Sequence, residues 1–100
     1  MKKILLVCAA GMSTSLLVQK MEKAAQDAGE EVEIQALSVT EAPKLIDTVD
    51  IVLLGPQVKY QQESIEKLAG GRIPVEVIDM RDYGTMNGEK VLKETLEKLK

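Results

Sequence analysis

Four short runs of apolar residues are spaced along the chain, and they predict four β-strands. Residues 4–8 and 51–54 are almost continuously apolar, which is typical of strands that are covered on both faces. Residues 32–37 alternate apolar and polar side chains, and residues 75–78 form a short run that includes Glu76. These two patterns indicate edge strands, with the two continuous runs at the centre of the sheet.

Apolar residues also recur at helical spacing between these runs and after the last one. Gly29 and the pair Gly70-Gly71 are stop signals for two of the helices, and Thr40 is placed to cap a short one. The predicted helices span residues 15–28, 41–48, 57–69 and 89–100.

This alternation of strand and helix predicts an α/β fold with a parallel sheet and helices on both faces. The burial patterns order the four strands 2-1-3-4, a flavodoxin-like arrangement in a single domain over residues 1–100. Right-handed crossovers then place the first and last helices on one face and the middle two on the other. Ligands bind such sheets beyond the carboxyl ends of the strands, which here means the gap between the first and third strands.

Composition restricts what this domain can bind. The chain has no Phe or Trp and only two Tyr, so its core must be aliphatic. The net charge of −3 is small and both signs are interspersed, which argues against a nucleic-acid partner and against stable binding to an anionic membrane. No run reaches the ~20 apolar residues that span a bilayer, so we expect no direct membrane insertion.

Cys8 is the only cysteine in the chain, and there is no histidine. A single cysteine cannot form an internal disulfide, which indicates a reducing compartment. The absence of histidine excludes histidine-based metal sites, Cys-His dyads and histidine general bases. We expect no metal and no cofactor, and we expect a monomer.

The segment after the first strand is the strongest candidate for a functional site. Cys8 ends a buried central strand, and the chain runs from it directly into the first predicted helix. Backbone N–H groups at a helix N-terminus, with the positive end of the helix dipole behind them, bind anions and favour the thiolate of a nearby cysteine. A thiolate in this place can attack phosphorus and hold the product dianion. The expected phosphate-binding loop consists of Ala9, Ala10, Gly11, Met12, Ser13, Thr14 and Ser15.

A purely structural interpretation of this segment stays open. A lone cysteine at a strand end is usually a small buried hydrophobe, and only the small residues and three hydroxyls after Cys8 favour a site. Ser13 fits the position of a helix N-cap, and Ser15 can be structural in either case. The two interpretations of these hydroxyls do not exclude each other.

The sequence Cys-Ala-Ala-Gly-Met-Ser-Thr-Ser-Leu-Leu-Val at residues 8–18 resembles the active loop of the IIB components of the bacterial phosphoenolpyruvate-dependent sugar phosphotransferase system. Within that family, it is most similar to the lactose/cellobiose (chitobiose) group. Residues 53–57 and 75–79 also resemble the third and fourth strands of that group, so the resemblance covers essentially the whole chain.

This resemblance implies a cytoplasmic phosphotransferase, a phosphoryl carrier in sugar uptake that works through a covalent phosphocysteine. Its cysteine would accept a phosphoryl group from a phosphohistidine of a IIA partner. It would then donate the group to a sugar, expected to be a β-linked disaccharide, that a IIC membrane permease translocates. By position in the motif, Cys8 is the phosphorylated residue and residues 9–15 are the phosphate loop, or P-loop.

The predicted architecture also resembles the low-molecular-weight tyrosine phosphatases, whose loop has the pattern Cys-x5-Arg. Thr14 stands at the arginine position of that pattern. Without a guanidinium, the loop is a weaker clamp for the transition state of phosphate hydrolysis. This difference favours a carrier over a phosphatase or an arsenate reductase.

Two other classes of protein fit the predicted fold less well. A flavin mononucleotide carrier would bind its phosphate at this loop and its ring beside Tyr60 and Tyr83, but the loop begins with a cysteine and the chain has no other aromatic residue. A response-regulator receiver needs acidic residues after the first strand and an aspartate ending the third. The chain has Cys8-Ala9-Ala10 and Leu54-Gly55 at those places.

A charged segment follows the fourth predicted strand and lies near the expected crevice. We interpret its residues Asp79, Arg81, Asp82 and Tyr83 as a solvated, charged loop with a helix cap. The alternative is that Arg81 neutralises phosphate and Asp79 acts as an acid.

Residues near the other strand ends are candidates for contact with a partner. Gln57 and Tyr60 follow the third predicted strand, after a turn that Pro56 shapes. A second candidate is an apolar docking rim, with ordinary packing as the alternative, formed by Met12, Leu16 and Met86.

Overall fold

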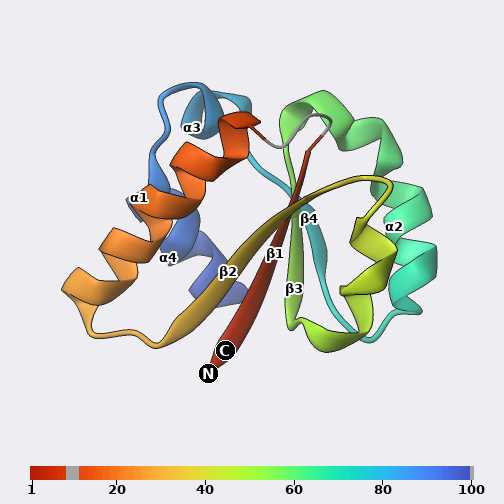
Figure 1. Cartoon of the computed structure of the whole chain (residues 1–100), viewed down its shortest axis with the longest axis horizontal. Helices are drawn as coiled ribbons and strands as arrows, with labels where there is room; N and C mark the ends of the chain where they lie inside the picture. The colour runs from red at the N-terminus through yellow and green to blue at the C-terminus, as the bar shows by residue number, and fades with distance from the viewer. Residues whose placement is uncertain (9–11, 100) are drawn as a thin grey trace.

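Four parallel strands form the centre of the molecule in the computed structural model, which describes residues 1–8 and 12–99 and, for residues 12–14, only the backbone (Figure 1). The strands are β1 (Lys2–Cys8), β2 (Val32–Ser38), β3 (Ile51–Leu54) and β4 (Val75–Val77). Their order in the sheet is β2-β1-β3-β4, which confirms the predicted order. The two continuous apolar runs, β1 and β3, are the central strands.

The register brings the carboxyl ends of the strands to one edge of the sheet. Val7 of β1 pairs with Leu54 of β3, and Cys8 pairs with Ser38 at the end of β2. The ladder continues one residue past β3, because the Gly55 backbone N–H donates to the Val7 carbonyl oxygen at 2.9 Å. The segments that follow the central strands therefore start side by side.

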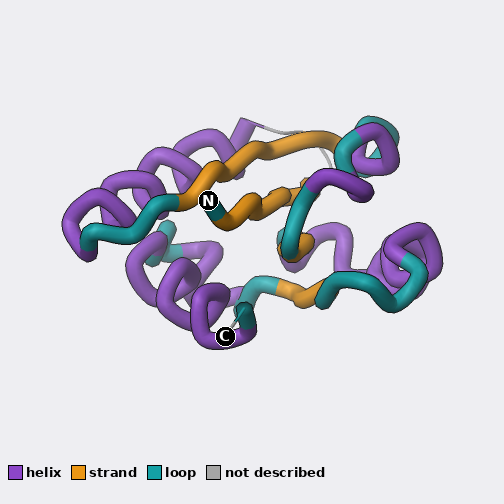
Figure 2. The backbone as a smooth tube through the Cα atoms, turned by 90° about the horizontal axis from the view of Figure 1, so that it is seen from below, coloured by secondary structure: helices purple, strands orange, loops and turns teal. Residues whose placement is uncertain are grey.

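Helices cover both faces of the sheet (Figure 1). On one face lie α1 (Met12–Ala28), α3 (Met80–Gly84) and α4 (Gly88–Lys98). On the other lie α2 (Gln62–Ala69) and the 3₁₀ helices η1 (Ala42–Lys44), η2 (Ile46–Thr48) and η3 (Pro56–Gln61). Figure 2 shows the strands as a layer between these two sets. The predicted placement of the first and last helices on one face is confirmed.

Alternating side chains of β1 supply two separate cores. Ile4 and Leu6 pack with α1 and α4, whereas Leu5 and Val7 pack with the 3₁₀ helices and α2. All four side chains are at most 1% exposed. Burying each of them contributes about 1.5–3 kcal/mol. The position of β1, and of the cysteine at its end, is therefore fixed from both faces of the sheet.

The predicted helix at residues 41–48 is wrong, because this segment forms η1 and η2. Its backbone N–H groups donate to the carbonyl three residues earlier, from Leu45 to Ala42 at 3.1 Å and from Thr48 to Leu45 at 2.8 Å. Pro43 has no N–H, so one donor of an α-helical ladder is missing. The Thr48 hydroxyl also donates to the Leu45 carbonyl oxygen at 2.8 Å, which competes with a longer helix.

The predicted helix at residues 57–69 divides into η3 and α2. The backbone is also irregular inside η3, at Val58, whose φ of −116° and ψ of 21° are not helical. Val58 is 1% exposed and packs in the core on the α2 side, so burial of its side chain holds this irregular turn. The predicted end of α2 is confirmed, since Gly70 follows it with a left-handed φ of 64°.

The helices at the two ends of the chain begin earlier than predicted. α1 begins at Met12 and α4 begins at Gly88, whereas residues 15 and 89 were expected. None of the helices in the described part of the chain combines the length and the apolarity that a membrane span requires.

Candidate functional site

Cys8 is the last residue of the central strand β1, and its side chain is 2% exposed. Ser38 lies beside it on β2, and the end of β3 lies on its other side. α1 begins at Met12, so a long helix starts shortly after the thiol, as the sequence predicted. The burial agrees with a structural cysteine and equally with a nucleophile that is kept in a protected place.

The predicted phosphate-binding loop falls mainly on residues that the structure leaves out. Ala9, Ala10 and Gly11 lie outside the described residues, as do the side chains of Met12, Ser13 and Thr14. The backbone shows that Ser13 lies inside α1, so its predicted role as N-cap is wrong. Ser15 is an exposed residue in the first turns of α1. The assignment of residues 9–15 to phosphate binding stays a prediction.

Two side chains that follow other strands converge next to Cys8, at Gly55. A methyl group on Gly55 would lie 2.7 Å from Gln57 Oε1 and 3.4 Å from Tyr83 Cε2, so both side chains occupy the space that Gly55 leaves open. Tyr83 is 7% exposed, whereas Tyr60 on η3 is 73% exposed. Because one tyrosine is packed in the core and the other is in solvent, they do not form the flanking pair that a flavin ring would need.

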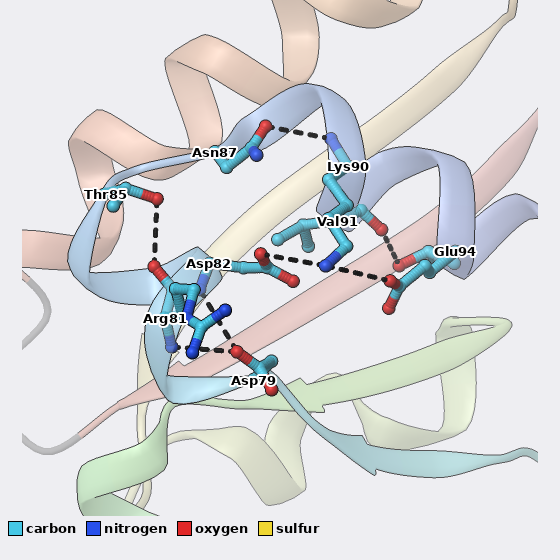
Figure 3. A network of polar contacts seen from close by, with 9 residues as sticks. Asp79, Arg81, Asp82, Thr85, Asn87, Lys90, Val91 and Glu94 are labelled. Carbon is cyan, nitrogen blue, oxygen red and sulfur yellow. Dashed lines mark hydrogen bonds and ion pairs between the residues drawn. The ribbon is translucent and has the colours of Figure 1, made fainter.

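Asp79 is the N-cap of α3, which confirms the predicted helix cap. Its Oδ1 accepts from the backbone N–H of Arg81 at 2.8 Å and from that of Asp82 at 3.4 Å (Figure 3). This geometry is that of a structural cap and not that of a proton donor aimed at a substrate.

The expectation of a solvated loop after β4 is wrong for Asp82 and Tyr83. Asp82 is 4% exposed, and the Lys90 ammonium lies 3.4 Å from its carboxylate. Figure 3 shows Lys90 between Asp82 and Glu94, with α3 facing α4. The short helix turns both side chains inward, whereas Asp79 and Arg81 are exposed, as expected for a solvated segment.

The proposed apolar rim is only partly exposed. Leu16 is 48% exposed on α1, but Met86 packs against the core under α1 and α4, as in the alternative interpretation. The side chain of Met12 lies outside the described residues. Met80, which was not singled out from the sequence, is 70% exposed at the start of α3.

A cavity of about 270 Å³ lies between β4 and α4, away from Cys8. Its walls include Glu76, Asp79, Asp82, Glu94 and Lys98. Four carboxylates against one ammonium make this cavity unfavourable for a phosphoryl dianion. Among the described residues, no three His, Cys, Asp or Glu side chains form a group that could hold a metal ion.

The chain matches a known protein family over nearly its full length. Residues 3–94 match the family described as PTS system, Lactose/Cellobiose specific IIB subunit. The chain is 47% identical over 97 residues to the oligo-β-mannoside-specific EIIB component of Bacillus subtilis strain 168, with 96% of this chain and 94% of that protein covered. It is also 47% identical to the cellobiose-specific EIIB component of Lactococcus lactis subsp. lactis strain IL1403, with 91% and 90% covered. A galactose-specific EIIB component of Lactococcus lactis subsp. cremoris strain MG1363 is 46% identical.

Solved structures share the fold of this chain, and one of them is also similar in sequence. A cellobiose-specific IIB component from Borrelia burgdorferi is 43% identical and superposes with a TM-score of 0.81, with 98% of this chain and 91% of that chain covered. The lactose-specific IIB domain from Streptococcus pneumoniae has a TM-score of 0.89 at 19% identity over 99% of this chain and 98% of that one. A mutant of YwlE from Bacillus subtilis shares the fold at a TM-score of 0.56 and 15% identity, with 99% and 93% covered.

Proposed function

The chain belongs to the lactose/cellobiose-specific IIB family of the sugar phosphotransferase system, and on this premise we propose that Cys8 is its phosphoryl-carrying residue. IIB components are sugar phosphotransferases that act through a phosphocysteine, together with IIA and IIC components. The observation that carries the assignment is that Cys8 is the only cysteine in the chain. Its place at the carboxyl end of the central strand β1 supports it, because ligands of such sheets bind at that edge.

The proposed reaction has two displacement steps at one phosphorus atom. In the first, the Cys8 thiolate attacks a phosphohistidine of the IIA partner, so that the S–P bond forms and the N–P bond breaks with its electron pair on the imidazole nitrogen. In the second, a hydroxyl oxygen of the sugar on the IIC permease attacks the phosphorus. The S–P bond breaks with its electron pair on sulfur, which restores the thiolate, and the hydroxyl proton passes to water. Backbone N–H groups of residues 9–15 bind the phosphoryl oxygens in this proposal.

Two residues favour carriage of the phosphoryl group over its hydrolysis. Thr14 replaces the arginine of the phosphatase pattern, so the site has no guanidinium at that position to clamp a hydrolytic transition state. Asp79 accepts two backbone hydrogen bonds as the cap of α3, which commits its carboxylate to structure. A carrier must retain its cargo until the sugar arrives, so both features suit the role.

We propose a β-linked disaccharide as the sugar. Two of the relatives that are 47% identical are named for cellobiose and for oligo-β-mannoside, which share β-glycosidic bonds. The third relative is named for galactose, so a monosaccharide is the competing candidate. We further propose that residues 1–100 act as one monomeric IIB domain in the cytoplasm, where a IIA partner and the inner face of the permease can both reach it.

Reconstitution tests this function. The protein is combined with a histidine-phosphorylated IIA component and with vesicles that contain a IIC permease of the same family, and phosphorylation of cellobiose and of galactose is measured. We expect the disaccharide to be phosphorylated faster, and Cys8→Ser to abolish both reactions. Faster phosphorylation of galactose would overturn the sugar assignment. Full activity of the Cys8→Ser protein would overturn the assignment of the carrier residue.

A further inference from the structure

Tyr83 and Gln57 are far apart in the sequence, yet their side chains meet at the same point of the sheet, at Gly55. Tyr83 belongs to α3, which follows β4, and Gln57 belongs to η3, which follows β3. The position that a methyl group on Gly55 would take lies 2.7 Å from Gln57 Oε1, 3.4 Å from Tyr83 Cε2 and 3.7 Å from Tyr83 Cζ. Since Cζ carries the phenol hydroxyl, it is the polar end of the Tyr83 ring that lies at the end of β3.

This point faces the same side of the sheet as the Cys8 side chain. Alternate residues of a strand point to the same face. Leu6 of β1 and Leu53 of β3 pack in the core under α1 and α4, and Tyr83 belongs to that core. Cys8 is two residues after Leu6, and Gly55, just past the end of β3, is two residues after Leu53. The Cys8 side chain and the position that a methyl group on Gly55 would take therefore lie on this same face of the sheet.

Cys8 and Gly55 are also neighbours across the sheet. Val7 pairs with Leu54, and the Gly55 N–H donates to the Val7 carbonyl oxygen at 2.9 Å, so the next position along β1 is beside Gly55. Neighbouring strands lie about 4.8 Å apart. A phosphoryl group on the Cys8 sulfur would therefore project beside the phenol of Tyr83 and the amide of Gln57.

We propose that Tyr83 and Gln57 contact the phosphoryl group on Cys8 and stabilise it as neutral hydrogen-bond donors. This inference rests on the proposed function, and it assigns two residues outside the predicted loop. The phenol O–H and the amide N–H₂ can each donate to a phosphoryl oxygen, once the amide turns its nitrogen toward the group. Neutral donors bind a dianion less tightly than a guanidinium does, which leaves the group transferable to the sugar.

The surroundings of α3 prepare Tyr83 for this role. Asp79 caps the helix, and the buried Asp82 carboxylate is held by Lys90 of α4 at 3.4 Å. These contacts hold the short helix that carries Tyr83 in place before any phosphoryl group arrives. Preorganised donors lose little free energy in ordering when the charge appears.

The experiment measures two properties of each variant: the rate of phosphoryl transfer from a histidine-phosphorylated IIA protein, and the ratio of alkylation rates of Cys8 by iodoacetate and by iodoacetamide. The ratio reports attraction of an anion to the site and does not need phosphorylation. Tyr83→Phe removes the hydroxyl and keeps the ring. Tyr60→Phe, at a residue that is 73% exposed, is its control for the alkylation ratio alone, because Tyr60 is a candidate for contact with the partner. Gln57→Glu adds a carboxylate, and Gln35→Glu makes the same charge change at an exposed position in β2.

We expect both site variants to lower the transfer rate about tenfold or more and to lower the iodoacetate preference. Gln35→Glu should match the native protein in both measurements, and Tyr60→Phe should match it in the alkylation ratio. Unfolding in urea is measured alongside, and Gln57→Glu changes an exposed residue, so the test stands even if Tyr83→Phe is unstable. Native transfer rates and native alkylation ratios in both site variants would overturn this inference. If the native protein accepts no phosphoryl group, the proposed function is overturned. The alkylation ratios then still test whether Tyr83 and Gln57 attract an anion to Cys8.

Discussion

Gly55 and Gly88 both leave room that a methyl group would fill, but the neighbours of the two positions differ. A methyl group on Gly55 meets the amide end of the Gln57 side chain at 2.7 Å, which can rotate away. A methyl group on Gly88 meets the backbone carbonyl carbon of Lys20 and the backbone nitrogen of Met21, also at 2.7 Å. At Gly88 the backbones of α4 and α1 themselves are in contact, and neither can move alone.

Substitution of each glycine by alanine therefore has a different expected result. Gly88→Ala should destabilise the fold by about 1–3 kcal/mol because it separates two packed helices, although alanine usually favours a helix. Gly55→Ala should cost less than about 1 kcal/mol and should instead slow phosphoryl acceptance, because it displaces Gln57 and presses on Tyr83. Urea unfolding and transfer from phosphorylated IIA measure the two effects. Equal stability losses in the two variants would contradict this distinction.

At the scale of elements, a side chain of the last helix ties it to the edge of the sheet. Lys98 of α4 forms an ion pair with Glu76 of β4. The hydrogen bond to Glu76, with the charge of that carboxylate, raises the pKa of Lys98 above its ordinary value of 10.5. β4 has only three residues, so this contact adds to a short ladder.

The raised pKa gives the sign of a pH dependence. The folded state holds the Lys98 proton more tightly than the unfolded state does. The pair therefore stabilises the fold fully from neutral pH up to about 10.5 and loses its effect as the pH rises through the folded-state pKa. Lys98→Met should lower the free energy of unfolding slightly at neutral pH, and its difference from the native protein should shrink above pH 10.5. Glu76→Gln is the matched control and should show the same trend. A difference that stays constant across this range would contradict the role of the pair.

Helical periodicity did not predict the division of one segment into η3 and α2. Residues 57–69 carry a continuous helical pattern, yet they form η3 and α2, and the buried Val58 inside η3 has non-helical backbone angles. α3 has five residues, which is too short for apolar periodicity to indicate it. Asp79 followed by Asp82 three positions later was the available signal, since an acidic cap and an acidic first turn begin many helices.

At the scale of the whole molecule, the order of the strands could be predicted because it depends on burial alone. A run such as residues 51–54 has no polar face, so only a central position covers it, whereas Glu76 requires a wetter one. The place of Cys8 at the end of β1 could also be predicted, because it follows from the same pattern, whereas its role as phosphoryl carrier stays a prediction. The meeting of Gln57 and Tyr83 over Gly55 could not, because it depends on the direction in which η3 and α3 leave the sheet.

The burial of Asp82 is a second feature that could not be predicted from the sequence. The segment that contains it is rich in charge and is typical of a solvated loop. Its burial depends on Lys90, which lies on another helix and supplies the opposite charge at 3.4 Å. Such a pairing is visible only once α3 and α4 are placed against the same face of the sheet (Figure 3).

The central claim is that this chain carries a phosphoryl group on Cys8, and the intact mass of the protein tests it most directly. The native protein and Cys8→Ser are each incubated with a histidine-phosphorylated IIA protein, and the mass is recorded before and after. The account predicts that the native protein gains the mass of one phosphoryl group and that Cys8→Ser, which keeps a side chain of similar size at this buried position, gains none. An unchanged native mass, or the same gain in Cys8→Ser, would contradict it.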